Sequence, residues 1–398
     1  MNGMDIIVTG LQPWDVEIGS NCKNIAIEFA KNNRVLYVNA PLDRLTAIRE
    51  KNDIKTIRRK KVLKGELPGL SKVENNIWEF NPKCILESIS RLDINPLFDF
   101  LNKINNKRIA KQIQLAIEEL DFKNVILFND SDMFRSFYLK DLLGINKEIY
   151  YTRDNLIAVD FWKKQGIRIE AAYMKKADLV CGNSTYLTAL AKKFNPNSFY
   201  VGQGCDLSIF DEKLINDIPD DIKKIKNLGK PIIGYIGALV SLRLDIDIIK
   251  YLAEKKPDWN IVLVGPEDEA FKSSSLHKME NVYFLGGKNP EELPSYLYAF
   301  DVAINPQILN EVTIGNYPRK IDEYLAMGKP TVATKTEAMS VFSQFTYLAS
   351  NKEEYLKYTE LAINDTNQDK KDAMIAFARS HSWENSVKEI YNALEKIS

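Results

Sequence analysis

Histidine is the scarcest side chain in this chain of 398 residues, which contains only His277 and His381. Histidine is the side chain that most often acts as a general base near neutral pH, and it is the commonest metal ligand. His381 directly precedes a helical pattern, and we expect it to be structural. The scarcity argues against a histidine base and against a histidine-rich metal centre.

Cysteine and long apolar runs are also scarce. The four cysteines are widely separated and none forms a C-x-x-C pair, so the sequence indicates neither a zinc site nor a disulfide framework. No stretch approaches the ~18–20 apolar residues of a membrane-spanning helix. The first residues lack the basic and apolar regions of a signal peptide. We therefore expect a protein of the reducing cytoplasm.

Net charge is absent as well, because 54 lysines and arginines balance 54 aspartates and glutamates. No overall field therefore favours nucleic acid. The exception is the basic segment at residues 49–64, REKNDIKTIRRKKVLK, in which isoleucine, valine and leucine are interspersed. Two interpretations stay open: a solvated segment, or a patch that meets anionic lipid headgroups or a lipid diphosphate acceptor. The segment lacks interleaved aromatic side chains, so nucleic acid is not an expected partner.

Short apolar runs alternate with helical patterns through almost the whole chain. Runs that are apolar on both faces and separated by helices favour parallel sheets covered on both sides, as in the α/β class. A polar stretch between Phe210 and Lys230 separates two such series. We therefore predict two doubly wound Rossmann-like domains, formed by residues 1–210 with 380–398 and by residues 225–379. The predicted strands are 5–10, 34–41, 124–129, 148–153, 178–183 and 199–204 in the first domain, and 231–240, 260–265, 281–286, 301–306 and 330–334 in the second.

The segment NYPRKIDEYLAMGKPTVAT is the most informative in the chain. Pro318 suits the first position of a short helix, and Gly328 suits its end. Arg319 and Lys320 then fall in the first turn, where the helix dipole repels cations, so a bound anion would explain them. Glu323 shares their face one turn deeper, where a carboxylate could hold ribose hydroxyls. The alternative is a surface ion pair between Arg319 and Glu323 on an ordinary helix.

This segment resembles the donor-binding helix of GT-B glycosyltransferases, and most closely the retaining family 4 enzymes (glycosyl transferases group 1) of bacterial surface polysaccharide synthesis. The resemblance extends backward through PIIGYIGALVSLRLD, NIVLVGP and NVYFLGGKNPEELPSYLYAFDVAINP. In the first half, MDIIVTGLQPW, ADLVCGNSTYL and VGQGCDLSIF are looser matches. The terminal HSWENSVKEIYNAL resembles the helix that crosses back onto the first domain. The resemblance implies a GT-B fold, with two domains facing a cleft and the nucleotide sugar bound by the second.

The resemblance also implies roles for individual residues. Glu323 matches the carboxylate that holds the donor ribose, and Arg319 and Lys320 match the basic position just before it. Arg243, in the loop after the first strand of the second domain, matches a second diphosphate cation. The chain departs from the family at Gly315, where many members carry an acid, and in having no lysine close behind Arg243.

Backbone groups complete the expected donor site. Glycines after two strands would let a ligand approach the main chain, and the loop before the informative segment would give N–H groups to a phosphate. The lysine after the third strand would lie beside the nucleotide base. These donor-binding residues are Gly237, Gly286, Gly287, Lys288, Thr313 and Ile314.

The first domain is expected to hold the acceptor. An inverting enzyme needs a general base there, and Asp154 and Asp15, which follow apparent strands, are the carboxylates we would choose. An aspartate in such a place also caps helices. The poverty in histidine is compatible with a retaining mechanism, in which the leaving diphosphate oxygen takes the acceptor proton. The loop after the first strand would face the diphosphate or the acceptor, through Gly10, Gly19, Ser20 and Asn21.

The sequence therefore predicts a glycosyltransferase that moves a sugar from a nucleoside diphosphate sugar to a glycan or lipid-linked acceptor hydroxyl. The mechanism is expected to be retaining and to need no metal or other cofactor, because Arg243, Arg319 and Lys320 neutralise the leaving diphosphate. The expected location is the cytoplasm, and association with the inner face of the cell membrane through residues 49–64 stays open. Two alternatives remain: an epimerase or hydrolase on the same fold, which the scarcity of histidine argues against, and a non-catalytic nucleotide-sugar-binding protein.

Overall fold

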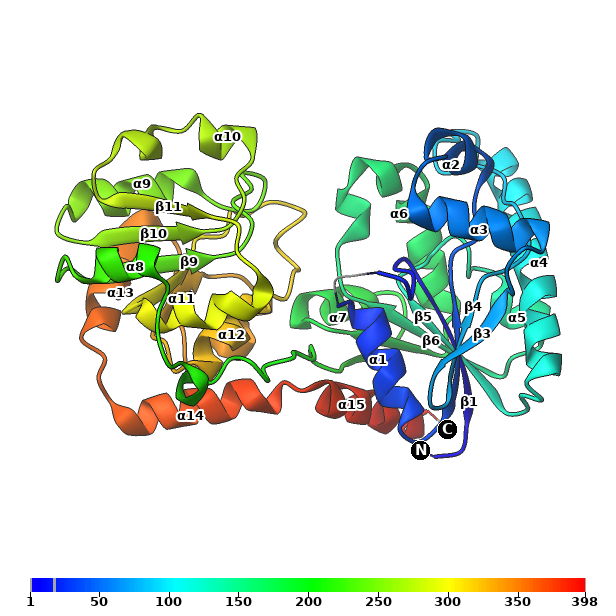
Figure 1. Ribbon diagram of the computed structural model, residues 1–398. Coiled ribbons are helices and arrows are strands. Elements are labelled where there is room, and N and C mark those ends of the chain that lie inside the picture. Colours follow the sequence, from blue (N-terminus) through cyan, green and yellow to red (C-terminus); the bar gives the residue numbers. More distant parts are fainter. Residues whose placement is uncertain (1, 17–18, 398) are drawn as a thin grey trace. The chain divides into compact units, whose positions relative to one another are not determined.

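The computed structural model describes residues 2–16 and 19–397. Contacts divide the chain into two units: the first runs to Gly202 and takes up the chain again at Trp383, and the second is Gln203–Ser382. Each unit is an α/β domain built on one mainly parallel sheet (Figure 1). The predicted fold class, two doubly wound Rossmann-like domains, is confirmed.

The first unit contains an eight-stranded sheet in the order β3-β4-β2-β1-β5-β6-β7-β8. Every neighbouring pair is parallel except β3 and β4. Separate clusters of buried apolar side chains line its two faces, and the C-terminal helix α15 (Trp383–Glu395) belongs to one of them. The strands are β1 Asp5–Gly10, β2 Arg34–Val38, β3 Leu70–Glu74, β4 Ile77–Phe80, β5 Val125–Asp130, β6 Lys147–Thr152, β7 Leu179–Gly182 and β8 Ser198–Tyr200.

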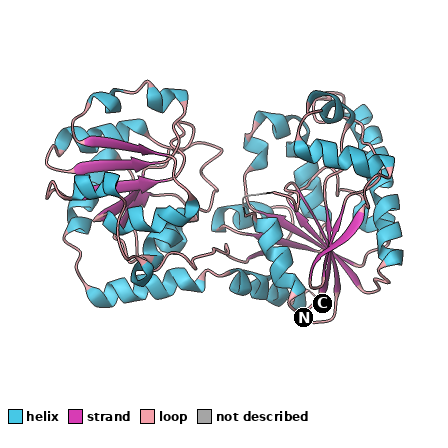
Figure 2. Ribbon diagram, viewed as in Figure 1, coloured by secondary structure: helices cyan, strands magenta, loops and turns pink. Residues whose placement is uncertain are grey.

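Helices cover both faces of this sheet, as the colouring by secondary structure shows (Figure 2). Helix α15 packs beside α1. Asn33, just after α1, donates a hydrogen bond of 2.8 Å to the hydroxyl of Tyr391 in α15. The predicted crossing helix is thereby confirmed. The other helices are α1 Asn21–Ala30, α2 Arg44–Arg49, α3 Ile54–Lys64, α4 Asn95–Glu119, α5 Leu139–Leu143, α6 Asp160–Lys176 and α7 Thr185–Lys192, with a 3-10 turn at Leu156–Ala158.

The second unit contains a six-stranded, all-parallel sheet in the order β11-β10-β9-β12-β13-β14. One apolar cluster packs α8, α11, α12 and α14 against one face, and another packs α9 and α13 against the other. The strands are β9 Ile232–Ile236, β10 Asn260–Val264, β11 Val282–Gly286, β12 Val302–Asn305, β13 Thr331–Thr334 and β14 Tyr347–Ala349. The helices are α8 Asp220–Lys226, α9 Ile246–Lys255, α10 Glu269–Lys272, α11 Leu293–Ala299, α12 Lys320–Ala326, α13 Lys352–Ile363 and α14 Gln368–Ser380, with 3-10 turns at Glu212–Leu214, Ser275–Lys278, Pro290–Glu292 and Ala338–Phe342.

All the predicted strands are present, but the sequence analysis missed the β3–β4 hairpin and β14. Strand β3 reads LSKVE and is only partly buried, so it lacks the apolar run of an interior strand. The structure also divides the chain at different residues from those predicted. Leu207 and Phe210, assigned from sequence to the first domain, lie in a core cluster of the second unit. Within residues 2–16 and 19–397, no helix is long and apolar enough to cross a bilayer.

Candidate functional site

The helix at the centre of the predicted site is α12, and its first residue is Lys320. Pro318 lies before the helix rather than at its first position, and Arg319 occupies the N-cap without a side-chain capping bond. Gly328 follows the helix in the left-handed conformation, with φ of +62°, which is a common way to end a helix. The stop was therefore predicted correctly, whereas the start was placed too early.

Lys320 lies against the end of β9. Its Nζ donates a hydrogen bond of 2.6 Å to the Tyr235 hydroxyl and sits 4.5 Å from the centre of that ring. A Cβ added to Gly237 would come within 3.0 Å of Lys320 Nζ and 2.9 Å of the Tyr235 hydroxyl. The glycine at this position therefore gives room for the ammonium group at the carboxyl end of the strand, where ligands bind in open α/β sheets.

Glu323 lies one turn further along α12. Within the described residues its carboxylate accepts no hydrogen bond and forms no ion pair. Burial raises its pKa, while Arg319 and Lys320 act in the opposite direction. The alternative of an Arg319–Glu323 surface ion pair is therefore wrong, because the two side chains influence each other only at longer range. A half-buried carboxylate left without partners is available to hydroxyl donors.

Asp322, which the sequence analysis did not single out, is fully buried on the other side of α12. It accepts a hydrogen bond of 2.8 Å from the Tyr317 hydroxyl, and one of its oxygens lies 2.6 Å from His381 Nδ1. The Cys205 thiol also donates to it, over 3.2 Å, and the Cys205 N–H donates to the His381 carbonyl. This cluster anchors the helix, and it includes His381, which the sequence analysis expected to be structural. The sequence offered one signal for Asp322, because it is an acid directly before Glu323, the carboxylate expected to hold the ligand.

Arg243 lies in the loop between β9 and α9. Its side chain is exposed and forms no ion pair with a described residue. The loop that follows β12 is fastened to this one, because Ile308 donates its N–H to the Arg243 carbonyl over 2.9 Å and the Asn310 side chain donates to the Leu242 carbonyl over 2.8 Å. Two segments predicted to contact the donor therefore lie side by side.

Thr313 and Ile314 belong to this second loop. Their backbone N–H groups both donate to Asn310, over 3.0 Å to its side-chain oxygen and 3.0 Å to its carbonyl. The N–H groups predicted to bind a phosphate are thus engaged within a local turn. They could reach a phosphate only if these bonds were replaced.

The end of β11 differs between its glycines and its lysine. Gly286 has φ of +70° and open space where a Cβ would stand, and Gly287 is exposed. Lys288, in contrast, donates to Asp221 over 2.8 Å, lies over the Tyr296 ring, and has its pKa raised by these partners. The glycines leave backbone accessible to a flat ligand, whereas the lysine charge is already neutralised.

In the first unit, the predicted acceptor-side residues are closely packed. A Cβ on Gly10 would come within 2.9 Å of the Cys22 sulfur and 3.1 Å of Asp130. Ser20 is the N-cap of α1 and accepts the Lys23 N–H over 3.1 Å. Asn21, the first helical residue, is buried, whereas Gly19 is exposed.

The two carboxylates proposed as a general base are both bound by arginines. Asp15 forms ion pairs with Arg58 at 3.4 Å and with Arg59 at 3.2 Å. Asp154 pairs with Arg153 at 3.0 Å, and Arg153 in turn holds the fully buried Asp130 at 2.8 Å. Two cations of the basic segment are thus used inside the domain.

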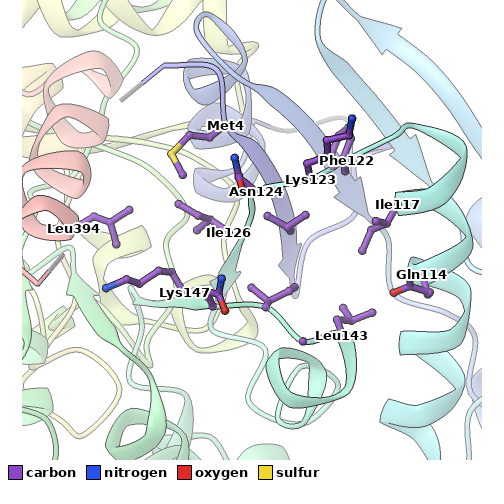
Figure 3. Close-up of a pocket in the computed structure, with 14 residues that line it drawn as sticks. Met4, Gln114, Ile117, Phe122, Lys123, Asn124, Ile126, Leu143, Lys147 and Leu394 are labelled. Carbon is purple, nitrogen blue, oxygen red and sulfur yellow. The ribbon is translucent and has the colours of Figure 1, made fainter.

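No cluster of three or more histidine, cysteine, aspartate or glutamate side chains able to hold a metal is found in residues 2–16 and 19–397. A cavity of about 340 Å³ opens at the amino ends of β5 and β6, between α4 and α15 (Figure 3). It is lined in part by Lys123, Asn124 and Lys147, and none of the predicted site residues borders it. Within the first unit, the predicted acceptor-side residues follow the carboxyl ends of the strands, whereas this cavity lies at the amino ends.

Comparison with known proteins supports the resemblance. Residues 230–356 match the family model described as glycosyl transferases group 1. The chain is 29% identical over 196 residues to TuaH of Bacillus subtilis (strain 168), which is described as a glycosyltransferase of teichuronic acid biosynthesis. That match covers 47% of this chain and 48% of the relative, so it spans about half of each.

Two solved structures cover nearly the whole chain. HepE of Anabaena in complex with UDP superposes with a TM-score of 0.63 at 15% identity, covering 99% of this chain and 100% of that one. Sucrose-phosphate synthase of Thermosynechococcus elongatus gives a TM-score of 0.63 at 13% identity, with 100% of both chains covered. At such identities the likeness establishes the fold, which is GT-B.

Proposed function

From the match of residues 230–356 to the glycosyl transferases group 1, we propose that this protein transfers a sugar from a nucleoside diphosphate sugar to an acceptor hydroxyl. The observation that carries the proposal is the environment of Glu323. Its half-buried carboxylate has no hydrogen-bond partner in the described residues, and Arg319 and Lys320 lie within electrostatic range of it. An unpartnered carboxylate suits ribose hydroxyls, and the neighbouring cations suit a diphosphate.

The cations have the catalytic task in this proposal. Cleavage of the donor leaves negative charge on the diphosphate, and cations fixed beforehand around it stabilise the transition state more than the ground state. Lys320 is held by the Tyr235 hydroxyl rather than by an acid, so its charge is available. Arg243 and Arg319 are exposed and can close onto the leaving group.

We further propose that transfer is retaining and metal-independent. Asp15 and Asp154 are paired with arginines, which makes them weak candidates for a base. In a retaining reaction the leaving diphosphate oxygen can accept the acceptor proton, so such a base is not required. Arg243, Arg319 and Lys320 together would offset the diphosphate charge that a divalent cation neutralises in other enzymes.

The relatives suggest which substrates to test first. HepE was solved with UDP and also with UDP-glucose, and TuaH is described as acting in teichuronic acid biosynthesis. We propose a uridine diphosphate sugar as donor. The proposed acceptor is a glycan or a lipid-linked glycan precursor at the inner face of the cell membrane.

A non-catalytic nucleotide-sugar-binding protein is the second candidate, favoured by one observation: Gly315 stands where many family members carry an acid. An epimerase or hydrolase is less well supported, because neither histidine is available for chemistry. His277 stacks on Phe284 and pairs with Glu267, and His381 belongs to the Asp322 cluster.

A thermal-shift screen against UDP, GDP, CDP, ADP and dTDP tests the donor site. A ligand at 100 times its Kd should stabilise the fold by ~2.7 kcal/mol. We expect one diphosphate to raise the melting temperature and Glu323→Ala to abolish the shift. Glu353→Ala, which changes an exposed carboxylate on α13, is the control. No response to any nucleotide would refute the donor site, whereas binding without sugar transfer to glycan acceptors would favour the non-catalytic alternative.

A further inference from the structure

Positive charge is concentrated in one short part of a chain that is neutral overall. Residues 44–64 contain nine lysines and arginines but only two acids, although the whole chain has a formal charge of +0. In the structure this stretch forms α2 (Arg44–Arg49) and α3 (Ile54–Lys64), joined by a short turn. We call these two helices the α2–α3 hairpin (Figure 1).

Part of this charge holds the hairpin on the domain. Arg58 binds Glu79 at 2.6 Å and Asp15 at 3.4 Å, and the buried Arg59 binds Asp15 and the Ala40 carbonyl. Asp15 and Ala40 follow β1 and β2. The hairpin is therefore fixed to the carboxyl ends of two central strands, next to the expected acceptor region of the first unit.

The remaining charge is free to meet a partner. Arg44 and Lys64 pair with Glu87 and Glu66. The other cations of the hairpin form no ion pair with a described residue; they are Arg49, Lys51, Lys55, Lys60 and Lys61. Such uncompensated charge attracts an anionic surface.

Exposed apolar side chains accompany these cations. Ile54, at 82% exposure, and Ile48, at 71%, are the two most exposed large apolar side chains among the described residues. Leu45 and Ile57 of the same hairpin are also exposed. Isolated apolar side chains on a surface need no explanation. Ile48, near the end of α2, and Ile54, at the start of α3, instead flank one turn of a cationic element, a combination of apolar and basic side chains that suits a membrane interface.

We propose that the α2–α3 hairpin docks onto an anionic lipid bilayer. Ile48 and Ile54 enter the headgroup region, and the unpaired cations contact lipid phosphates. Nucleic acid is disfavoured as the partner, because residues 44–64 contain no aromatic side chain for base stacking. The biological purpose of this docking rests on the proposed function, in which the acceptor lies at the membrane. Docking itself does not require sugar transfer.

The test is cosedimentation of the full chain with vesicles of phosphatidylglycerol and phosphatidylcholine, against vesicles of phosphatidylcholine alone. The wild type should bind the anionic vesicles, and added salt should weaken that binding. Ile48→Ser/Ile54→Ser removes apolar contact without changing charge, and Arg49→Gln/Lys51→Gln/Lys55→Gln removes charge without changing the apolar residues. Each cation near an anionic surface strengthens binding by about fivefold, so the variant that lacks three cations should bind about 100-fold more weakly. Loss of two isoleucine side chains from the headgroup region should weaken binding by at least about tenfold.

Matched controls are available elsewhere on the protein. Leu228→Ser/Leu361→Ser changes two exposed apolar residues of the second unit, and Lys103→Gln/Lys107→Gln/Lys111→Gln changes three exposed cations of α4. Both should bind vesicles as the wild type does. Equal loss in the controls, unchanged binding in the hairpin variants, or binding of RNA in preference to anionic vesicles would overturn the proposal. Parallel measurement of UDP binding separates this result from failure of the proposed donor site, which the hairpin variants should leave intact.

Discussion

Charged side chains at the carboxyl ends of the two sheets differ in whether they have ionic partners. In the second unit, Lys320 lies at the end of β9 and bonds only to a neutral hydroxyl, while Glu323 has no partner in the described residues. In the first unit, Asp15, Asp130 and Asp154 are each held by an arginine. Among the described residues, Lys320 and Glu323 are thus left without an ionic partner, although Lys288 at the end of β11 is paired with Asp221. The three aspartates of the first unit are all satisfied within the fold.

The difference indicates which carboxylates are functional. Even partial burial of an ionised group without a partner, as for Glu323 among the described residues, disfavours the folded state, and a ligand that supplies the missing interaction would offset this cost. A buried, paired group is sufficiently explained by stability alone. On this reasoning we propose Glu323 as a ligand contact, whereas Asp15, chosen from sequence as a candidate base, is part of the attachment of the α2–α3 hairpin.

The largest effect should follow removal of the Lys320 charge. We expect Lys320→Ala to lower kcat/KM for sugar transfer by about 10²–10³, the range seen when a preorganised charge-stabilising group is removed. Lys335→Ala, which changes an exposed lysine after β13, should have almost no effect. If steady-state kinetics showed equal losses in the two variants, the catalytic assignment of Lys320 would fail.

Gly237 offers a steric test of the same place. A Cβ there would stand 3.0 Å from Lys320 Nζ, and the residue has φ of +140°. Gly237→Ala should therefore weaken nucleotide binding by about tenfold or more and destabilise the fold by ~1–3 kcal/mol. Gly229→Ala, at φ of +68° with open space around it, adds backbone strain without the clash. Calorimetric binding of UDP should separate the two variants, and equal affinities would show that room for Lys320 is not required.

The pH dependence of binding should be several-fold and should depend on Glu323. Burial raises its pKa above the ordinary 4.5, so the folded protein binds this proton more tightly than the unfolded chain does. The folded state is therefore favoured, relative to the unfolded state, as pH falls through this window. Donor binding should change in the opposite direction, because a protonated carboxyl accepts ribose hydroxyls less well. Affinity for UDP-glucose should fall as pH decreases toward the raised pKa of Glu323, and Glu323→Gln should give a flat profile.

The sequence predicted most of the architecture because alternating apolar runs and helical patterns report burial directly. It also identified α12, since cations at a helix start conflict with the dipole. The β3–β4 hairpin escaped detection because its edge strand is polar and partly exposed. The missed features are those without a local signature.

Partners far apart in sequence could not be predicted in this way. Nothing local to Asp322 indicates that Cys205 and His381 converge on it. Likewise, the pairing of Asp15 with Arg58 and Arg59 depends on where α3 packs. The chemical type of a side chain could be read from sequence, whereas its availability to a ligand depends on its partners in the fold.

Substitutions of the paired aspartates in the first unit should have the smallest effect on donor binding. They are the strictest test of the contrast between paired and unpaired charges in the two sheets. Asp15→Asn should destabilise the fold by about 1–2 kcal/mol, since it leaves the nearly buried Arg59 with a neutral partner. It should leave UDP affinity unchanged. Asp154→Asn, at a more exposed side chain, should cost less stability. Thermal unfolding, UDP titration and an assay of sugar transfer are to be made on both variants. Full stability with abolished transfer in Asp15→Asn would make this carboxylate catalytic despite its ion pairs, and the contrast between the two sheets would then not distinguish functional from structural charge.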